Sequence, residues 1–312
     1  MSKPPILVFA YHDVGYECLS LLIERRENIT AVITHEDNPN EQIWFKSVKD
    51  LARRNNILTF TPQSVNTPDW IGRIRAWNPQ IIFSFYYRNM IKEDILNIPR
   101  LGAFNMHGSL LPRYRGRVPI NWAVLHGEKE TGVTLHYMVK HADAGDIVDQ
   151  ELIPIIADDT ALDVFLKAVK AARIVLERQI DDLITGTAPR LKQDESQATY
   201  FGGRKPEDGR IDWTQGVEKI YNLIRAVTHP YPGAFTDVDG KRLFIWWARP
   251  ITDTCAKPGQ ILSVRPLRIA TGSGSLEILK LQWDGMNEED AAAGTHGLIK
   301  GEILGGSERF LS

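Results

Sequence analysis

Cysteine and long apolar runs are scarce in this sequence. The 312 residues include two cysteines, Cys18 and Cys255, which are too few for a disulfide framework or a cysteine-ligated zinc cluster. The longest apolar stretch near the N-terminus, from Ile6 to Tyr11, is far too short to cross a bilayer. Met1 does not lead into the basic region, apolar core and cleavage site of a signal peptide. We therefore expect a reduced, cytoplasmic protein that is not inserted into a membrane.

An excess of positive charge is also missing. The chain carries 37 Lys and Arg against 39 Asp and Glu, and residues 205–312 carry 13 against 14. Neither half therefore offers the basic surface through which proteins bind nucleic acid by releasing counterions. The histidines show no HxxxH or HExxH spacing, so we expect no metal site. Charge and histidine spacing thus argue against nucleic acid as a partner and against a metal as a cofactor.

Strand and helix patterns alternate over the first hundred residues. Short apolar runs, typical of buried parallel strands, occur at residues 6–10, 29–34, 56–60 and 81–85. Helical spacing occurs between them, at residues 14–24, 43–54 and 67–77. Thr67 can cap the last of these helices, with Pro68 in its first position. The predicted fold class is α/β, with a doubly wound parallel sheet and helices on both faces.

The chain changes character after a polar linker. Residues 131–138 and 146–153 alternate like strands, and a long amphipathic helix is expected at 160–184. The stretch from about 186 to 203 is polar and irregular, so we divide the chain there into domains 1–203 and 204–312. A helix and five short strands in the second domain predict a small OB-like β-barrel. The helix is expected at 216–227, and the strands at 234–238, 242–248, 259–264, 267–270 and 276–282.

The usual dinucleotide signature is absent. The first strand is followed by YHDVGY, from Tyr11 to Tyr16, rather than by GxGxxG, and no P-loop occurs. NAD and FAD are therefore disfavoured. Open α/β sheets bind their ligands at the carboxyl ends of the strands, so the segments after Ala10, Phe85 and Phe104 are the expected location of a site.

The segment after Phe104 carries the most chemistry. Asn105 and His107 lie two residues apart, and such residues point to the same side of an extended chain. Asp143 lies on a polar loop after a later strand, where a carboxylate can orient an imidazole and raise its pKa. These groups suit acyl transfer to an amine. Asn105 and a protonated His107 could stabilise the oxyanion, and His107 or Asp143 could accept the proton of the amine. Ser109, a rival nucleophile, lacks a GxSxG elbow.

Four short motifs occur in order around these residues: NMHGSLLP from Asn105, RYRG from Arg113, ETGVT from Glu130 and DAG from Asp143. The ordered set resembles the formyltransferases that use 10-formyltetrahydrofolate. The resemblance implies a Rossmann-like domain followed by a smaller barrel-like domain. It also implies that Asn105, His107 and Asp143 form the catalytic trio.

Longer matches cover nearly the whole chain, including VFAYHD from Val8, FSFYYR from Phe83 and ATYFG from Ala198. They are closest to the formyltransferase domain of a bifunctional polymyxin-resistance protein, a branch that formylates UDP-4-amino-4-deoxy-L-arabinose. The resemblance implies a folate co-substrate held along the main chain of two segments, which comprise Asn89, Met90, Ile91, Val139, Lys140, His141, Ala142 and Asp143. It also implies that Arg117 contacts bound ligand. Tyr87 and Arg88 are candidate substrate contacts for another reason, because they lie at the end of a strand, where ligands gather.

Two features depart from that branch. His141 stands where the branch carries Arg, which puts a titratable group near the folate site, and the chain ends at Ser312 without the second enzyme, a decarboxylase. Other functions therefore stay open. They are a dTDP-amino-sugar acceptor, a methionyl-tRNA acceptor, a folate-binding protein without catalysis, and a plain OB-type nucleic-acid binder. The even charge argues against both nucleic-acid functions, Arg117 argues further against the tRNA, and the intact trio argues against a non-catalytic role. A homo-oligomer is compatible with the sequence.

Overall fold

The computed structural model describes residues 3–39, 43–252, 256–294 and 296–305, and Cys255 lies outside them. The chain divides into two compact units. The first comprises Met1–Pro119, Glu130–Pro154 and Phe165–Gly202, and the second comprises Ile120–Lys129, Ile155–Val164 and Gly203–Ser312. The long segment of the second unit starts close to the expected boundary, but two earlier segments also belong to that unit. The simple division into domains 1–203 and 204–312 stays a prediction.

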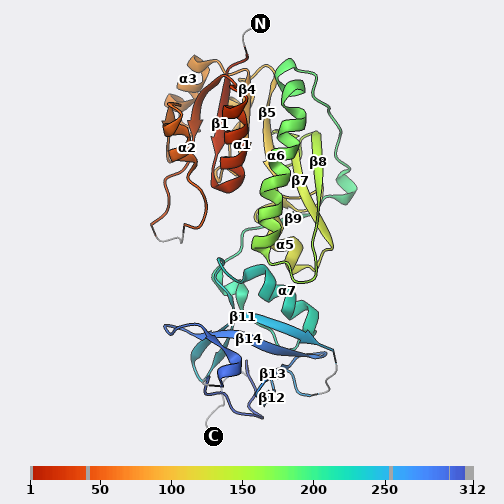
Figure 1. Ribbon diagram of the computed structural model, residues 1–312. Coiled ribbons are helices and arrows are strands. Elements are labelled where there is room, and N and C mark those ends of the chain that lie inside the picture. Colours follow the sequence, from red (N-terminus) through yellow and green to blue (C-terminus); the bar gives the residue numbers. More distant parts are fainter. Residues whose placement is uncertain (1–2, 40–42, 253–255, 295, 306–312) are drawn as a thin grey trace. The chain divides into compact units, whose positions relative to one another are not determined.

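The first unit is built on a seven-stranded sheet (Figure 1). Its order is β3-β2-β1-β4-β5-β7-β8. The strands are β1 (Ile6–Ala10), β2 (Ile29–Ile33), β3 (Thr59–Phe60), β4 (Ile81–Phe85), β5 (Gly102–His107), β7 (Glu130–Tyr137) and β8 (Ile147–Pro154). The first five strands of this order pair in parallel, whereas β7 runs antiparallel to β5 and to β8. The doubly wound α/β prediction is confirmed, and the antiparallel pair extends the sheet beyond β5.

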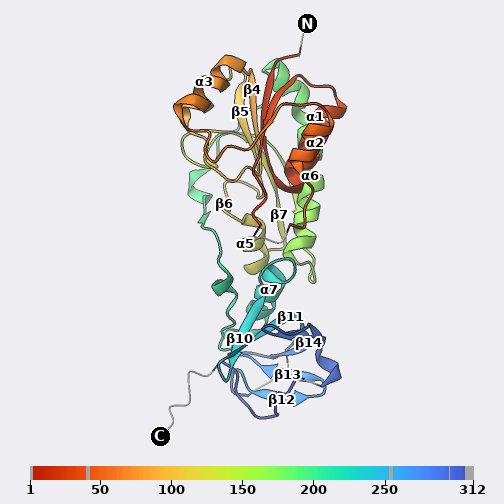
Figure 2. The ribbon, with the colours of Figure 1, turned by 90° about the vertical axis from the view of Figure 1, so that its left-hand side faces the viewer.

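Helices cover both faces of this sheet. Figure 2 shows α3 (Pro68–Trp77) on one face, and α1 (His12–Glu24), α2 (Val48–Arg54) and most of α6 (Ala161–Thr185) on the other. Successive residues of a strand point to opposite faces. Leu7 and Phe9 of β1 accordingly join the core cluster that contains Ile74 of α3. Since β1 is buried along its whole length, its uninterrupted apolar sequence follows from having helices on both sides.

Local capping fixes where the helices begin. The side chain of Thr67 accepts a hydrogen bond from the backbone N–H of Trp70, and Pro68 occupies the first turn of α3, as predicted. The expected helix at 43–54 was too long, because Ser47 caps α2 and delays its start to Val48. Trp44 and Phe45 pack instead against the imidazole of His12, with ring centroids 4.6 and 3.9 Å away. The third strand shortens from the expected 56–60 to two residues.

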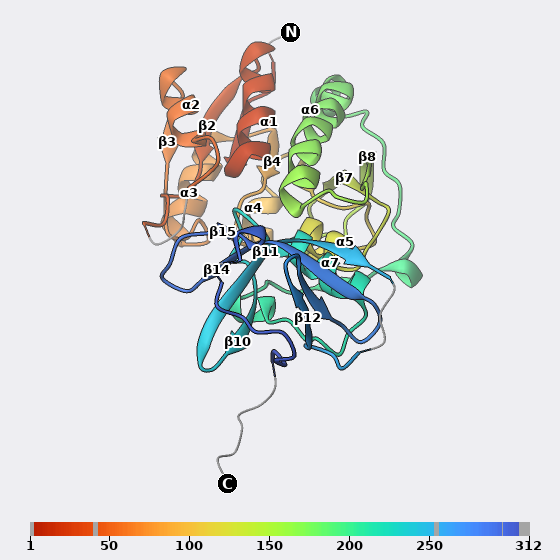
Figure 3. The same cartoon turned by 60° about the horizontal axis from the view of Figure 1, so that its bottom comes forward.

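The second unit contains α7 (Val217–Val227) and an antiparallel sheet of order β10-β11-β14-β13-β12 (Figure 3). Its strands are β10 (Ala234–Val238), β11 (Lys241–Ile251), β12 (Ile261–Val264), β13 (Leu267–Ala270), β14 (Ser275–Trp283) and β15 (Glu289–Asp290), which pairs with β14. All five expected strands are present. No ladder joins β10 to β12 among the described residues, so closure into an OB-like barrel stays a prediction.

Short elements complete the path between these larger ones. They are α4 (Glu93–Leu96), β6 (Arg115–Gly116), α5 (Pro119–Leu125) and β9 (Tyr200–Phe201). β6 and β9 pair in parallel although they are far apart in sequence. Among the described residues, no helix has the length and apolar character needed to cross a membrane.

Candidate active site

A cavity of about 550 Å³ lies where β4, β5 and β7 present their polar side chains. Ser84 of β4, Asn105 and His107 of β5 and His136 of β7 all line it. The expected site residues that line it are Tyr87, Arg88, Asn89, Met90, Ile91, Asn105, His107, Arg117, Val139, Ala142 and Asp143. The carboxyl ends of β4 and β5 therefore hold the site, as the general rule for open α/β sheets predicts.

Two of the expected residues do not line this cavity. Lys140 and His141 are exposed on the loop that precedes Asp143. The ammonium of Lys140 lies 3.7 Å from a carboxylate oxygen of Glu93. Their neighbours Val139, Ala142 and Asp143 line the cavity instead.

His107 is buried at the end of β5 and its ring is held from both sides. Nε2 lies 2.8 Å from the backbone oxygen of Tyr114, to which it donates its proton. Nδ1 lies 3.5 Å from Oδ1 of Asp143. Burial lowers the pKa of His107 below its usual value, although the Asp143 carboxylate and the Tyr114 carbonyl oppose this shift. Burial therefore favours the neutral imidazole, and with Nε2 donating to Tyr114 the other ring nitrogen, Nδ1, faces Asp143.

Asp143 is a charged carboxylate in a largely buried position. Its Oδ2 accepts a hydrogen bond of 2.9 Å from the backbone N–H of Gly116, and Oδ1 lies 3.6 Å from Nε2 of His136. Burial by itself would raise the pKa of Asp143, but the positive charge that His107 and His136 carry when protonated, together with the Gly116 N–H, holds it well below its usual range. A carboxylate with so low a pKa is a poor proton acceptor and a good electrostatic partner.

His136 is the residue that the sequence analysis missed. It lies directly opposite Asn105 in the antiparallel β5–β7 ladder. Its Nδ1 donates to the backbone oxygen of Tyr137 at 2.9 Å, so Nε2 can accept a hydrogen bond from Nδ2 of Asn105 at 3.1 Å. The sequence signal for His136 was its position two residues after Thr134 of the ETGVT motif, which puts both side chains on the same face of the strand. It becomes informative only once β5 and β7 are known to be neighbours.

The serine considered as a rival nucleophile has a structural role. Ser109 is fully buried, and its hydroxyl donates to the backbone oxygen of Arg113 at 2.6 Å. Thr134 fixes the same loop, because its hydroxyl donates to the oxygen of Ser109 and accepts from the N–H of Leu111. A Cβ on Gly132 would lie 2.3 Å from Cδ2 of Leu110. The loop that carries SLLP therefore packs against the strand that carries ETGVT, which explains why the two motifs occur together.

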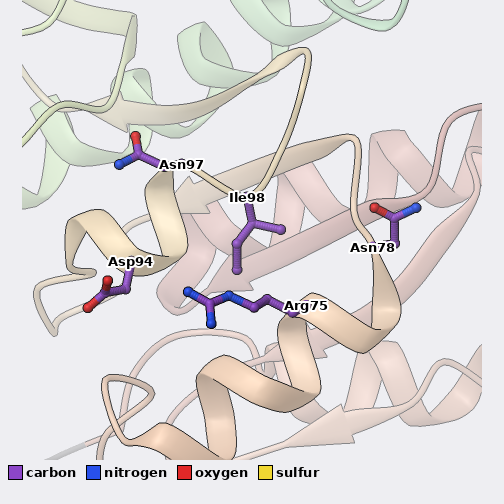
Figure 4. Close-up of a pocket in the computed structure, with 5 residues that line it drawn as sticks. All are labelled: Arg75, Asn78, Asp94, Asn97 and Ile98. Carbon is purple, nitrogen blue, oxygen red and sulfur yellow. The ribbon is translucent and has the colours of Figure 1, made fainter.

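A second hollow of about 470 Å³ lies at the ends of α3 and α4 (Figure 4). Arg75, Asn78, Asp94, Asn97 and Ile98 line it. This hollow contains no side chain that exchanges a proton near neutral pH. None of the expected site residues lines it. Among the described residues, no group of three or more His, Cys, Asp and Glu could hold a metal ion.

An amide, an imidazole and a buried carboxylate thus share one cavity at the carboxyl ends of parallel strands. These features suit an α/β enzyme that catalyses group transfer. Residues 7–180 match the family model described as "Formyl transferase", and residues 204–298 match the model described as "Formyl transferase, C-terminal domain". The chain belongs to the formyl transferase family.

Solved structures with the same fold include sugar N-formyltransferases. An N-formyltransferase from Helicobacter canadensis, in complex with folinic acid and dTDP-3-aminofucose, is 21% identical, with a TM-score of 0.67 over 89% of this chain and 99% of that one. WlaRD, a sugar 3N-formyl transferase solved with dTDP and 5-N-formyl-THF, is 22% identical, with a TM-score of 0.68 over 92% and 100%. A sugar N-formyltransferase from Shewanella sp. FDAARGOS_354 is 19% identical, with a TM-score of 0.63 over 77% and 95%.

Proposed function

We propose that this chain is an N-formyltransferase that moves the formyl group of 10-formyltetrahydrofolate to the amino group of a nucleotide sugar. The observation that carries the proposal is the convergence of Asn105, His107 and Asp143 on one cavity. Membership of the formyl transferase family supports the reaction. Structural neighbours solved with formyl-folates and dTDP or a dTDP-sugar support the two substrates.

In this mechanism His107 accepts the proton of the attacking amine. As the amine nitrogen bonds to the formyl carbon, Nδ1 of His107 takes its proton. The imidazolium that results donates from Nε2 to the oxygen of Tyr114 and faces Asp143 through Nδ1. His107 then returns the proton to N10 of the folate as the bond from the formyl carbon to N10 breaks. The Asp143 carboxylate, 3.5 Å from Nδ1, stabilises this imidazolium.

Asn105 stabilises the tetrahedral intermediate. Its Nδ2 has two protons, and one is directed to Nε2 of His136 at 3.1 Å. The other proton is available for the oxyanion that forms from the formyl oxygen. His136 thereby orients the amide so that its donor, rather than its oxygen, serves the reaction centre. This role needs no covalent enzyme intermediate, since the amine is itself the nucleophile.

The two substrates occupy different parts of the cavity lining in this proposal. The folate lies along the main chain of Asn89–Ile91 and of residues 139–143. Arg88 and Arg117 are exposed guanidinium groups at the cavity, suited to a carboxylate or a diphosphate because they are permanently charged and can bind bidentately. Tyr87 supplies an aromatic surface beside them, and its ring stacks on His35 with centroids 4.3 Å apart.

Two acceptors fit this chemistry. The resemblance of the sequence favours UDP-4-amino-4-deoxy-L-arabinose, formylated at its 4-amino group. This acceptor would make the chain a cytoplasmic enzyme of lipid A modification and polymyxin resistance. The neighbours solved with dTDP and with a dTDP-aminosugar favour a dTDP-amino sugar. Both acceptors present a sugar amine and a nucleoside diphosphate, so the reaction is the same for either.

A parallel formylation assay tests the proposal. The purified chain is given 10-formyltetrahydrofolate with UDP-4-amino-4-deoxy-L-arabinose, with a dTDP-4-amino sugar, or with methionyl-tRNA. Formylation of either nucleotide sugar supports the proposal and identifies the nucleotide. Formylation of methionyl-tRNA alone would refute the sugar acceptor, and absence of product with all three would leave the proposed function without support.

A further inference from the structure

Three segments that are far apart in sequence meet behind Asp143. Arg115 of β6 donates from Nε and Nη2 to Oε1 of Gln193, at 3.1 and 2.6 Å. Nε2 of Gln193 donates in turn to the backbone oxygens of Asp143 and Gly145, at 2.8 and 2.7 Å. The carboxylate of Asp143 then accepts from the N–H of Gly116, the residue after Arg115. The contacts form a closed ring through the catalytic loop.

The chemistry of Arg115 fixes which atom of Gln193 donates and which accepts in this ring. A guanidinium only donates, so Gln193 must turn its oxygen toward Arg115 and its NH₂ group toward the loop carbonyls. Arg115 itself is fixed, since its side chain is completely buried and also binds the carboxylate of Glu195 and the hydroxyl of Tyr200. Gln193 therefore reaches the loop as a preset double donor.

The loop needs such support because its backbone is unusual. Asp143 has a φ of 56°, in the left-handed region that a residue with a side chain avoids. A Cβ on Gly145 would lie 1.8 Å from the backbone oxygen of Tyr137. The loop is thus drawn tightly against β7, and the two hydrogen bonds from Gln193 hold it there. This position keeps Oδ1 of Asp143 3.5 Å from Nδ1 of His107.

We propose that Gln193 is a positioning residue for the transfer reaction, which acts by fixing the Asp143 loop through its two carbonyl contacts while Arg115 orients its amide. This inference rests on the proposed function for the step it serves. Gln193 does not line the cavity, it lies between the two segments that match the family models, and none of the sequence motifs described above contains it. Its effect on catalysis passes through the distance between Asp143 and His107.

The first test replaces Gln193 by Met, which keeps the length of the side chain and removes every hydrogen bond. We expect kcat to fall about 10- to 100-fold, the size expected when a catalytic group moves by about 1 Å, with a smaller effect on the KM of the folate. In the Asp143→Asn background the same change should lower kcat by less than about threefold, because there is no longer a carboxylate to position. Gln197→Ala, an exposed change in the same segment, is the matched control and should leave kcat unchanged.

A second readout does not depend on the acceptor. NMR titration of the His107 ring in the full chain should show its pKa lower in Gln193→Met than in the wild type, since the stabilising carboxylate is no longer held beside it. Gln193→Glu keeps the oxygen contact with Arg115 and removes the donor, so it tests the same point if Gln193→Met does not fold. We expect it to lower kcat as well.

Several results would overturn the inference. The first is a kcat within about twofold of the wild type in Gln193→Glu. The second is a loss of kcat from Gln193→Met that is as large in the Asp143→Asn background as in the wild type. The third is a lower thermal stability of Gln193→Met with an unchanged pKa of His107. The last result would mean that Gln193 is structural only. If the wild-type chain formylates no acceptor, the proposed function fails, while the titration still decides whether Gln193 positions Asp143.

Discussion

Replacing Asp143 by Asn tests the proton-transfer mechanism most directly. The change removes one negative charge 3.5 Å from Nδ1 of His107, and it keeps an oxygen that can accept from the N–H of Gly116. An opposite charge within about 4–6 Å moves a pKa by about 1 to 3 pH units. Because His136 and the Gly116 N–H also share this carboxylate, we take the lower part of that range, about 1 to 2 pH units, or roughly 1.4–3 kcal/mol.

The sign of the effect follows from which form of His107 is active. The neutral imidazole accepts the proton, so the rate falls at low pH as His107 becomes protonated. Without the carboxylate the pKa of His107 drops further, and the acid limb of kcat against pH moves to lower pH. At neutral pH the imidazolium formed during the reaction loses the same stabilisation, so kcat falls about 10- to 100-fold.

The assay is initial-rate formylation with the best acceptor, measured across the acid limb for the wild type and the variant. Asp146→Asn makes the same charge change three residues along the chain, at a side chain that does not line the cavity, and it should change neither kcat nor the profile. An acid limb that stays in place or moves to higher pH in Asp143→Asn would refute the idea that this carboxylate tunes His107.

Three further predictions concern catalysis and stability. His107→Ala should lower kcat about 10²- to 10⁴-fold while 5-formyltetrahydrofolate still binds, which calorimetry checks; turnover at the wild-type rate would reject His107 as the proton acceptor. Burial and the charge of Arg88 lower the pKa of His12 to about 3. The stability that the neutral His12 contributes is therefore complete above about pH 6.5 and is lost toward acid pH, by up to about 1.4 kcal/mol per pH unit. Urea denaturation should show a flatter dependence of the unfolding free energy on pH in His12→Gln. Gly145→Ala should destabilise the chain by about 1–3 kcal/mol in thermal melts, because its Cβ would collide with the backbone of β7. The control Gly72→Ala in α3 places a Cβ with nothing within 4 Å, and it should stabilise the chain by about 0.5–1 kcal/mol.

The core of the first unit could be predicted from local sequence because its signals are local. The runs of β1 and β4 are continuous and apolar, and they are buried on both faces. Thr67 and Pro68 predicted the start of α3 for the same reason, since capping depends on neighbours in the chain. The predicted start of α2 was wrong, because Ser47 caps the helix and Trp44 and Phe45 pack against His12, a partner that is distant in sequence.

The grouping of Asn105, His107 and Asp143, the proposed catalytic trio, was predictable in part. The i and i+2 spacing of Asn105 and His107 follows from strand geometry, and their joint lining of one cavity agrees with it. Asp143 was associated with them through the chemistry of a carboxylate on a polar loop, and the resemblance to a family strengthened that association, because no local pattern connects residues 107 and 143. His136 and Gln193 were missed, since each acquires its meaning from a neighbour that only folding supplies.

The sequence by itself determined the alternation of strands and helices, the lack of a dinucleotide motif and the identity of the polar residues at the ends of the strands. These depend on residues close together in the chain, whose side chains and caps interact over one or two turns. Tertiary structure decided the direction in which the pKa values of His107 and Asp143 shift, because burial lowers that of His107, and His107, His136 and the Gly116 N–H lower that of Asp143. It also decided that Asp143 is held from behind by Arg115 and Gln193, because electrostatic and hydrogen-bonding interactions depend on distance in space rather than on separation along the chain.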